Sequence, residues 1–171
     1  MTGKTPKSDL ILDELKKRRV REKVVDVEEK TVKIVVFTVL NAYYAFYGED
    51  VKEVLIPPEI FYVPGSPEHI LGVINVRGDI ESVLNINGLL GLPDSGCTQR
   101  TRIVIVEKNG VRSGIRIDSV EDVLDMPESA IKPPLCTLDK KAKEFVGGET
   151  AYNGRDVVLL NVGAVFGMFQ A

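Results

Sequence analysis

Short runs of β-branched and aromatic residues, separated by turn residues, dominate the chain from Thr31 onward. The first run covers residues 34–39, and after Asn41-Ala42 an aromatic run covers residues 43–47. Such residues are enriched in strands because their side chains pack well on a pleated surface. The pattern therefore predicts a β-hairpin over this segment.

Two Asn-Gly pairs predict two further hairpins. Asn109-Gly110 separates the apolar runs 103–107 and 111–117, and Asn153-Gly154 separates 151–152 from 157–160. Asn-Gly favours tight turns with positive φ, whose twist matches that of the flanking strands. These turns are the firmest local features of the sequence.

Two more strands are expected elsewhere in the chain. One covers residues 74–86, where Gly78 permits a bulge or a sharp bend, and a shorter one covers 120–124. Many short strands separated by turns indicate a mainly β protein built of small barrels.

Short helices are predicted in two places within this β-rich region. A turn or two of helix is expected at residues 50–55, ended by the prolines at 57 and 58, which cannot continue a helix. A second helix is expected over 162–169, where Val162, Val165, Phe166 and Phe169 share one face.

Residues 1–30 differ from the rest of the chain and are predicted to form a charged helical extension, which leaves 31–171 as the main domain. Apolar residues recur near helical spacing after a capping Ser8 or Asp9. The basic run 16–21 could contact an anionic surface, but the acidic run 26–29 nearly balances it. A solvated helix face is the favoured interpretation.

The charge balance argues against nucleic acid as the partner. The 171 residues carry a net charge of −3, whereas phosphate recognition needs a positive surface. A small barrel could still bind single strands through the aromatic run 43–47, but Glu49 and Asp50 follow it and no basic residues are interleaved. We expect no nucleic-acid partner.

The sequence also predicts a cytoplasmic protein without membrane insertion. Only three consecutive apolar residues, 10–12, occur near the N-terminus, which is too few for a secretory signal. The longest apolar stretch, 157–169, is interrupted by Asn161 and is shorter than the roughly 20 residues that cross a bilayer. Two cysteines in the whole chain fit a reducing compartment.

No catalytic, metal or cofactor site is visible in the sequence. His69 is the single histidine, and with Cys97 and Cys136 it provides too few ligands for a structural zinc site. The chain lacks a G-x-x-x-x-G-K-[ST] phosphate loop, and its adjacent acidic pairs, at 49–50 and 121–122, direct their side chains apart. We predict a protein that is not an enzyme and binds no cofactor and no metal.

One motif carries a specific resemblance. The segment Gly72-Val73-Ile74-Asn75-Val76-Arg77-Gly78 is similar to the G-V-I-N-L-R-G signature of the CheW family of chemotaxis adaptors, and the proline-containing loop 63–67 precedes it as in that family. The resemblance extends over 31–171: residues 37–39 resemble the family's first strand, 51–54 its V-x-E-I segment, and 117–124 its V-D-x-V-x-x-V-L strand.

The resemblance implies a fold and a function. The expected fold is mainly β, with two intertwined five-stranded SH3-like β-barrel subdomains that share an apolar core and carry short helices. The groove between the barrels would bind the cytoplasmic tip of a chemoreceptor. Another face of the first barrel would bind the regulatory domain of a CheA-type histidine kinase, so the protein would be a non-enzymatic adaptor.

Four candidate partner-binding residues follow from the resemblance. Val51, Glu53 and Val54 match a segment implicated in partner contact, and Arg77 matches the signature arginine. The planar guanidinium of Arg77 could tie a loop through carbonyls or meet a receptor carboxylate. We expect Val51 to contact a partner and Val54 to be buried, whereas Glu53 could be an ordinary exposed carboxylate.

The chain departs from the family pattern at three positions. Ser82 and Asn85 stand where Pro and Asp are usual, and Asn161 replaces a second frequent Asp, although an amide can still accept a capping hydrogen bond. These departures keep two alternatives open: a specialised CheW-like protein of a chemosensory pathway other than motility, or a detached regulatory module of a histidine kinase.

Overall fold

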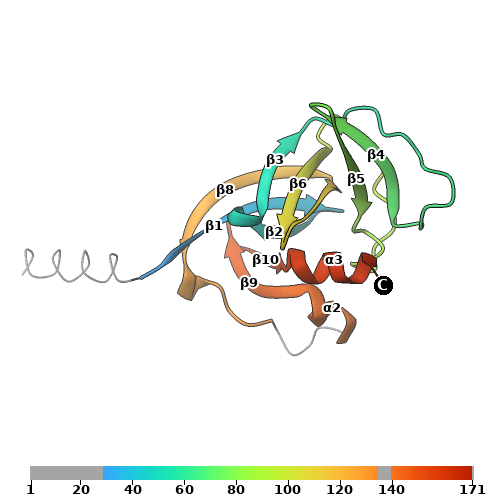
Figure 1. Cartoon of the computed structure of the whole chain (residues 1–171). Helices are drawn as coiled ribbons and strands as arrows, with labels where there is room; N and C mark the ends of the chain where they lie inside the picture. Colours follow the sequence, from blue (N-terminus) through green and yellow to red (C-terminus); the bar gives the residue numbers. More distant parts are fainter. Residues whose placement is uncertain (1–28, 135–139, 171) are drawn as a thin grey trace, which may run out of the picture.

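The computed structural model describes residues 29–134 and 140–170, which form two five-stranded sheets (Figure 1). The first sheet has the order β8-β1-β2-β10-β9, with the bounds Ser119–Pro127, Thr31–Val39, Ala42–Tyr47, Arg155–Leu160 and Val146–Tyr152. The second has the order β3-β6-β7-β5-β4, with the bounds Val51–Leu55, Arg102–Lys108, Val111–Ile117, Asp79–Asn85 and Ile70–Val76.

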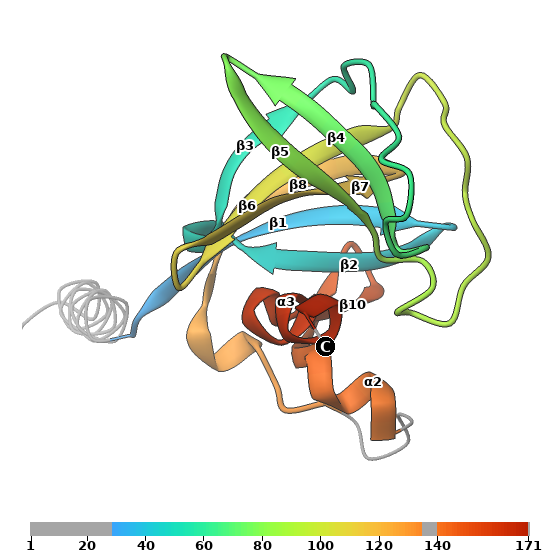
Figure 2. The same cartoon turned by 45° about the vertical axis from the view of Figure 1, so that its right-hand side comes forward.

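The two sheets are intertwined along the chain. β1 and β2 begin the first sheet, the whole second sheet follows, and β8 then returns to pair with β1. Each sheet contains one parallel pair, β2 with β10 and β7 with β5, while its other pairs are antiparallel. The predicted mainly β fold of two interleaved five-stranded units is confirmed, and Figure 2 shows the second sheet lying over β1 and β2.

The three predicted hairpins are confirmed. Their turns use consecutive residues with positive φ: Leu40 and Asn41 at 48° and 66°, Asn109-Gly110 at 53° and 79°, and Asn153-Gly154 at 49° and 75°. The residue pairs across each hairpin keep a continuous antiparallel register next to these turns. The Asn-Gly pairs were therefore sufficient to identify two of these turns. The first turn lies at Leu40-Asn41, one residue before the Asn41-Ala42 that the sequence suggested.

Two predictions were wrong. Residues 74–86 do not form one bent strand, because Arg77 (φ 54°) and Gly78 (φ 92°) reverse the chain between β4 and β5. Residues 50–55 are not helical: only Gly48–Asp50 forms a 3-10 turn, and β3 follows, paired with the buried strand β6. Pairing with β6 and the β-branched valines of β3 favour the extended conformation over a short helix.

The remaining elements are longer or more numerous than expected. The strand predicted at 120–124 is part of β8, a nine-residue strand of which eight residues pair with β1. The C-terminal helix is confirmed as α3 (Val162–Gln170), and a second helix, α2 (Lys140–Phe145), was not predicted. The predicted helical extension covers residues 1–30, of which 1–28 lie outside the described residues, and residues 29 and 30 are not helical.

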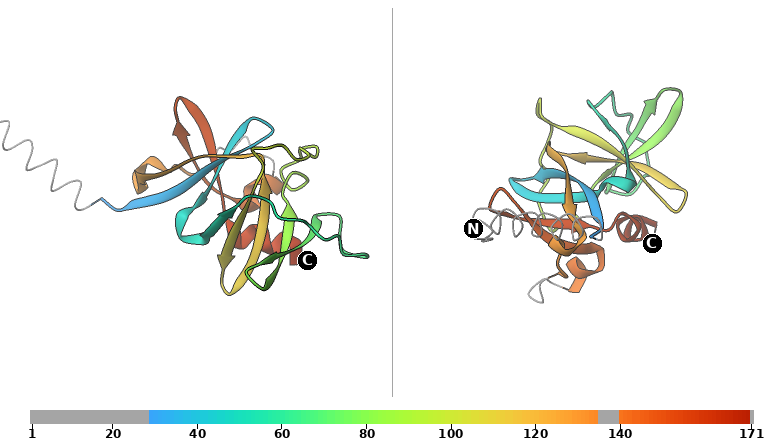
Figure 3. Two further views of the ribbon diagram at one scale, coloured as in Figure 1. Left: turned by 90° about the horizontal axis from the view of Figure 1, so that it is seen from above. Right: turned by 90° about the vertical axis from the view of Figure 1, so that its left-hand side faces the viewer.

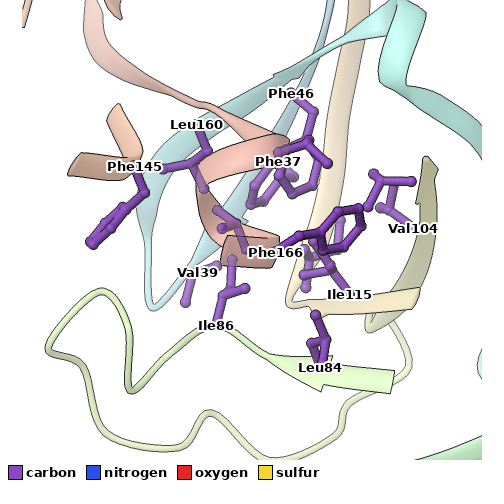
Figure 4. Close-up of a cluster of buried hydrophobic side chains, with 14 of the residues drawn as sticks. Phe37, Val39, Phe46, Leu84, Ile86, Val104, Ile115, Phe145, Leu160 and Phe166 are labelled. Carbon is purple, nitrogen blue, oxygen red and sulfur yellow. The ribbon is translucent and has the colours of Figure 1, made fainter. Parts of the chain in front are cut away.

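One apolar core joins both sheets to α3. Phe37 and Phe46 of the first sheet, Val104 and Ile115 of the second, and Phe166 of α3 all belong to one buried cluster, as Figure 4 shows. Smaller clusters lie within each sheet, one around Ile34, Val36 and Leu159 and the other around Ile74, Val83 and Ile103. Burial of this apolar surface fixes the position of the sheets relative to each other.

Asn161 caps the N-terminus of α3. It stands where the family frequently has Asp, and its amide oxygen takes the capping role that was expected of it. Its side-chain Oδ1 accepts a hydrogen bond from the backbone N–H of Ala164 at 3.1 Å, and its backbone carbonyl accepts one from Val165 at 2.9 Å. This is the usual N-cap arrangement, in which a short polar side chain satisfies an N–H group of the first turn.

Among the described helices, none is long and apolar enough to cross a membrane.

Candidate functional site

Two of the four predicted site residues form an ion pair with each other. Arg77 lies in the β4–β5 turn and Glu53 lies on β3, and Nη2 of Arg77 is 2.5 Å from Oε1 of Glu53. β3 and β4 are the two edge strands of the second sheet. The ion pair therefore connects the opposite edges of one curved sheet, a curvature visible in both views of Figure 3.

The two partners of this ion pair differ in exposure. The Arg77 side chain is 80% exposed, whereas the Glu53 side chain is only 21% exposed. Glu53 thus binds the guanidinium at Nη2, while the rest of the Arg77 side chain is mostly exposed to solvent. A guanidinium held in this way can still accept a carboxylate or carbonyl from another molecule.

The expected burial of the two valines is reversed. Val51 is half-buried and packs against the shared core, whereas Val54 is 40% exposed. The reason is the strand conformation of β3, in which successive side chains point to opposite faces, so residues three apart diverge. Val54 is therefore the valine that is available to a partner.

Val54 lines a groove between the two sheets, which we call the inter-sheet groove. A cavity of about 130 Å³ is lined by Val54, by Arg100 and Arg102 before and on β6, and by Ser119 and Val120 of β8. Arg100 Nη2 lies 3.3 Å from Oε1 of Glu121, at the same edge of the first sheet. Of these residues, the sequence predicted only Val54, because the others converge through pairing of strands far apart in the chain.

Large apolar side chains are exposed on the β3–β4 connection and on β5. Ile56 is 77% exposed, Phe61 53% and Tyr62 70%, and Ile80 of β5 is 67% exposed. The backbone of Phe61 pairs with Val73 of β4 through hydrogen bonds of 2.8 and 2.9 Å, so this connection runs beside β4 (Figure 2). Exposed apolar side chains in such number on one region indicate an interaction surface.

The positions that depart from the family pattern are satisfied within the fold. The hydroxyl of Ser82 lies 2.8 Å from that of Ser113 on the neighbouring strand β7, and Oδ1 of Asn85 accepts the backbone N–H of Asn87 at 3.0 Å.

Over the described residues, no group of three or more His, Cys, Asp or Glu side chains is placed to hold a metal ion.

Comparison with known proteins identifies close structural and sequence relatives. A family model described as CheW-like domain matches residues 33–170. The chain is 34% identical over 100 residues to chemotaxis protein CheW of Bacillus subtilis, which covers 58% of this chain and 64% of that protein. It is 29% identical over 99 residues to protein PilI of Pseudomonas aeruginosa, covering 58% of this chain and 56% of that protein.

The matched segments thus span a little under two thirds of the first relative and a little over half of the second. A solved structure gives the wider match. The crystal structure of the scaffolding protein TtCheW from Thermoanaerobacter tengcongensis superposes with a TM-score of 0.70 at 31% identity, covering 77% of this chain and 89% of that one.

Proposed function

Because the chain belongs to the CheW-like domain family, a family of non-enzymatic scaffolding proteins, we propose that it couples chemoreceptors to a CheA-type histidine kinase. In this function the chain makes and breaks no covalent bond. It holds a receptor and a kinase at the same time, so that each partner raises the effective concentration of the other.

The inter-sheet groove is the feature that carries this proposal. Its exposed Val54 offers an apolar contact, and Arg100 and Arg102 beside it offer cationic groups. A receptor tip is a helical segment, and a helix that lies in a groove uses apolar anchors flanked by polar contacts. We propose that the receptor tip binds here, with Val54 as an anchor and Arg100 and Arg102 as polar contacts. The outward donors of Arg77, which Glu53 holds, are proposed as a further polar contact outside this groove.

The kinase regulatory domain is proposed to bind a different surface. The sequence predicted this contact on the first barrel, but exposed large apolar side chains are concentrated on the second sheet and the connection before β4, including Ile56, Tyr62 and Ile80. Aromatic and aliphatic side chains of this kind are the usual anchors of protein interfaces. Glu53 would act through Arg77, by holding its guanidinium, and Val51 through the core beneath β3.

The test uses two variants with reciprocal expectations. The full chain is titrated with a cognate receptor-tip fragment and, separately, with the kinase regulatory domain. Val54→Arg should weaken receptor binding by at least about tenfold and leave kinase binding unchanged, and Ile80→Arg should do the reverse. A chain that binds neither partner at high micromolar concentration is not an adaptor of this kind.

A specialised role in another chemosensory pathway is the second candidate. It is favoured by the similarity to a relative that is named PilI rather than chemotaxis protein CheW. The two candidates differ in which kinase is bound. Co-purification of the chain with its kinase from the native cell, followed by identification of that kinase, distinguishes them, and recovery of a kinase fragment containing this same sequence would indicate a detached regulatory module.

A further inference from the structure

Arg102 and Val54 lie on the face of the second sheet that is turned toward the first sheet. Val54 of β3 pairs with Val104 of β6, and Arg102 is two residues before Val104 on the same strand. Directly paired residues share one face of a sheet, and so do residues two apart on one strand. Because Val104 is buried in the core that joins both sheets, Val54 and Arg102 point to the inter-sheet side, and both line the inter-sheet groove.

The turn before β6 is held by hydrogen bonds of its two threonines. The N–H of Thr98 donates to Oγ1 of Thr101 at 2.8 Å, and Oγ1 of Thr98 accepts the N–H of Arg100 at 3.1 Å. The N–H of Thr101 donates to the carbonyl of Thr98 at 3.2 Å, and Thr101 is buried. These local bonds satisfy the polar groups of the turn and fix its conformation.

This turn also holds one end of the Arg102 guanidinium. Nη1 of Arg102 donates to the carbonyl of Gln99 at 2.9 Å and to the carbonyl of Thr101 at 2.8 Å. The side chain therefore has a defined position within the free protein. A group that is already positioned loses less conformational entropy when it binds a partner.

The other two nitrogen atoms of this guanidinium are open to another molecule. Nη2 and Nε of Arg102 have no hydrogen-bond partner among the described residues. In that part of the chain, Nε2 of His69 is the single side-chain nitrogen or oxygen atom that is both shielded from solvent and unpaired. Nη2 and Nε of Arg102 are therefore accessible, and they are the two atoms that form one side of the guanidinium fork.

The charge of Arg102 is not balanced by an ion pair with any described carboxylate. Arg100, the other arginine of the groove, differs in this respect, because its Nη2 lies 3.3 Å from Oε1 of Glu121. Asp118 lines an adjoining cavity of about 190 Å³, but its carboxylate accepts the N–H of Leu40 at 2.7 Å and forms no ion pair with either arginine. Arg102 is only partly exposed, so a counter-charge beside it would be screened less than on an open surface.

The spacing of Val54 and Arg102 matches that of side chains on one face of a helix. The two residues are diagonal neighbours across the antiparallel pair of β3 and β6, and such neighbours lie about 7–8 Å apart. Side chains one turn apart on a helix are about 5–6 Å apart at their Cβ atoms and diverge toward their ends. One helix can therefore place an apolar side chain on Val54 and a polar one at Arg102.

From these observations we propose that Arg102 binds a carboxylate side chain of the receptor tip, one helical turn from the apolar side chain that contacts Val54. Nη2 and Nε donate to the two carboxylate oxygens, which is the bidentate geometry that a guanidinium favours. Arg102 is then a specificity-determining residue, because a tip with an apolar side chain at this place leaves its charge unpaired. This inference rests on the coupling function proposed above and names the chemistry of the segment that binds.

The first test is calorimetric titration of the full chain with a cognate receptor-tip fragment. Arg102→Gln should weaken binding by about tenfold. Arg155→Gln is the control, since it removes an arginine that contacts the ring of Tyr43 on the first sheet, and it should leave the affinity unchanged. Added salt should weaken binding by the wild type more than binding by Arg102→Gln, because only the wild type has the charge pair. Equal affinities of the wild type and Arg102→Gln would overturn the inference.

A charge reversal then identifies the carboxylate. Arg102→Glu is titrated with a series of tip fragments in which each Asp or Glu is replaced by Lys in turn. One of these fragments should bind the wild type more weakly than the native tip does, and should bind Arg102→Glu at least about tenfold more tightly than the native tip does. This rescue also shows that the variant is folded. If no fragment rescues Arg102→Glu, its partner is not a carboxylate. A wild type that does not bind the native tip overturns the coupling function itself, whereas native binding that does not depend on Arg102 overturns this inference alone.

Discussion

Arg77 and Glu53 form an ion pair that connects the two edges of the second sheet, with 2.5 Å between Nη2 of Arg77 and Oε1 of Glu53. The residues are 24 positions apart in the chain, with Glu53 on β3 and Arg77 in the β4–β5 turn. Both were predicted as partner-binding residues, and the structure brings them together. Their energetic role and their role in binding can therefore be separated by experiment.

The first prediction concerns the strength of this ion pair. Because the Arg77 side chain is 80% exposed, solvent screens the pair, and we expect a coupling free energy of about 0.5 kcal/mol in a double-mutant cycle of Arg77→Ala and Glu53→Ala. Urea unfolding of the four proteins measures it. A coupling free energy above about 2 kcal/mol would contradict the expected solvent screening. It would mean that the ion pair is a major contribution to the stability of the second sheet.

The second prediction contrasts the two valines of β3. Val51 packs against the shared core, so Val51→Ala should lower the free energy of unfolding by about 1 kcal/mol. Val54 is 40% exposed, and Val54→Ala should change it by less than about 0.5 kcal/mol. Denaturant unfolding of both variants under one condition compares them. Equal losses would mean that Val54 also packs against the core in solution.

Sequence reasoning succeeded where the signal is local. The Asn-Gly pairs at 109–110 and 153–154 encode their turns directly, because these residues adopt positive φ with little strain. Asn161 was correctly expected to keep the capping role of an Asp. The signature segment identified the family. The turn between β4 and β5 was missed, because Arg77 adopts a positive φ of 54° and arginine is not a residue that signals a turn.

The site could be predicted only in part, because its geometry depends on contacts distant in sequence. Glu53 reaches Arg77 only after β3 and β4 have become opposite edges of one sheet. Val54 reaches Ser119 and Val120 only after the chain has completed the second sheet and returned to the first. The exposure of Val54 also follows from β3 being a strand, and the sequence had favoured a helix there.

The third prediction tests the first glycine of the signature. Gly72 has φ of 149°, and a Cβ atom at this position would lie 2.3 Å from the carbonyl oxygen of Phe61. That oxygen accepts the N–H of Val73 at 2.9 Å, so it cannot move without breaking the pairing beside β4. We expect Gly72→Ala to lower the free energy of unfolding by about 3 kcal/mol.

Gly78, the second glycine of the signature, is the matched control for this substitution. It has φ of 92° but no atom within 4 Å of an added Cβ. Gly78→Ala therefore pays only the backbone strain, about 1 kcal/mol. Thermal unfolding compares the two variants, and a Gly72→Ala protein as stable as Gly78→Ala would show that the Phe61 contact is not maintained in solution.

The last prediction is a pH dependence carried by Asp94. Burial would raise the pKa of its carboxyl, but the charge of Arg116 and hydrogen bonds from the Gly96 and Ser95 backbones and the Arg116 side chain outweigh this, and the net pKa is lowered. A group whose pKa is lower in the folded state stabilises the fold above its unfolded pKa, and this contribution is lost as the pH falls through the folded value. The advantage of the wild type over Asp94→Asn should therefore be constant above about pH 5 and shrink below about pH 4. Urea unfolding across this range measures it, with Glu59→Gln as the control. An advantage that stays constant down to the acid limit would mean that Arg116 is held by hydrogen bonding alone, without the charge of Asp94.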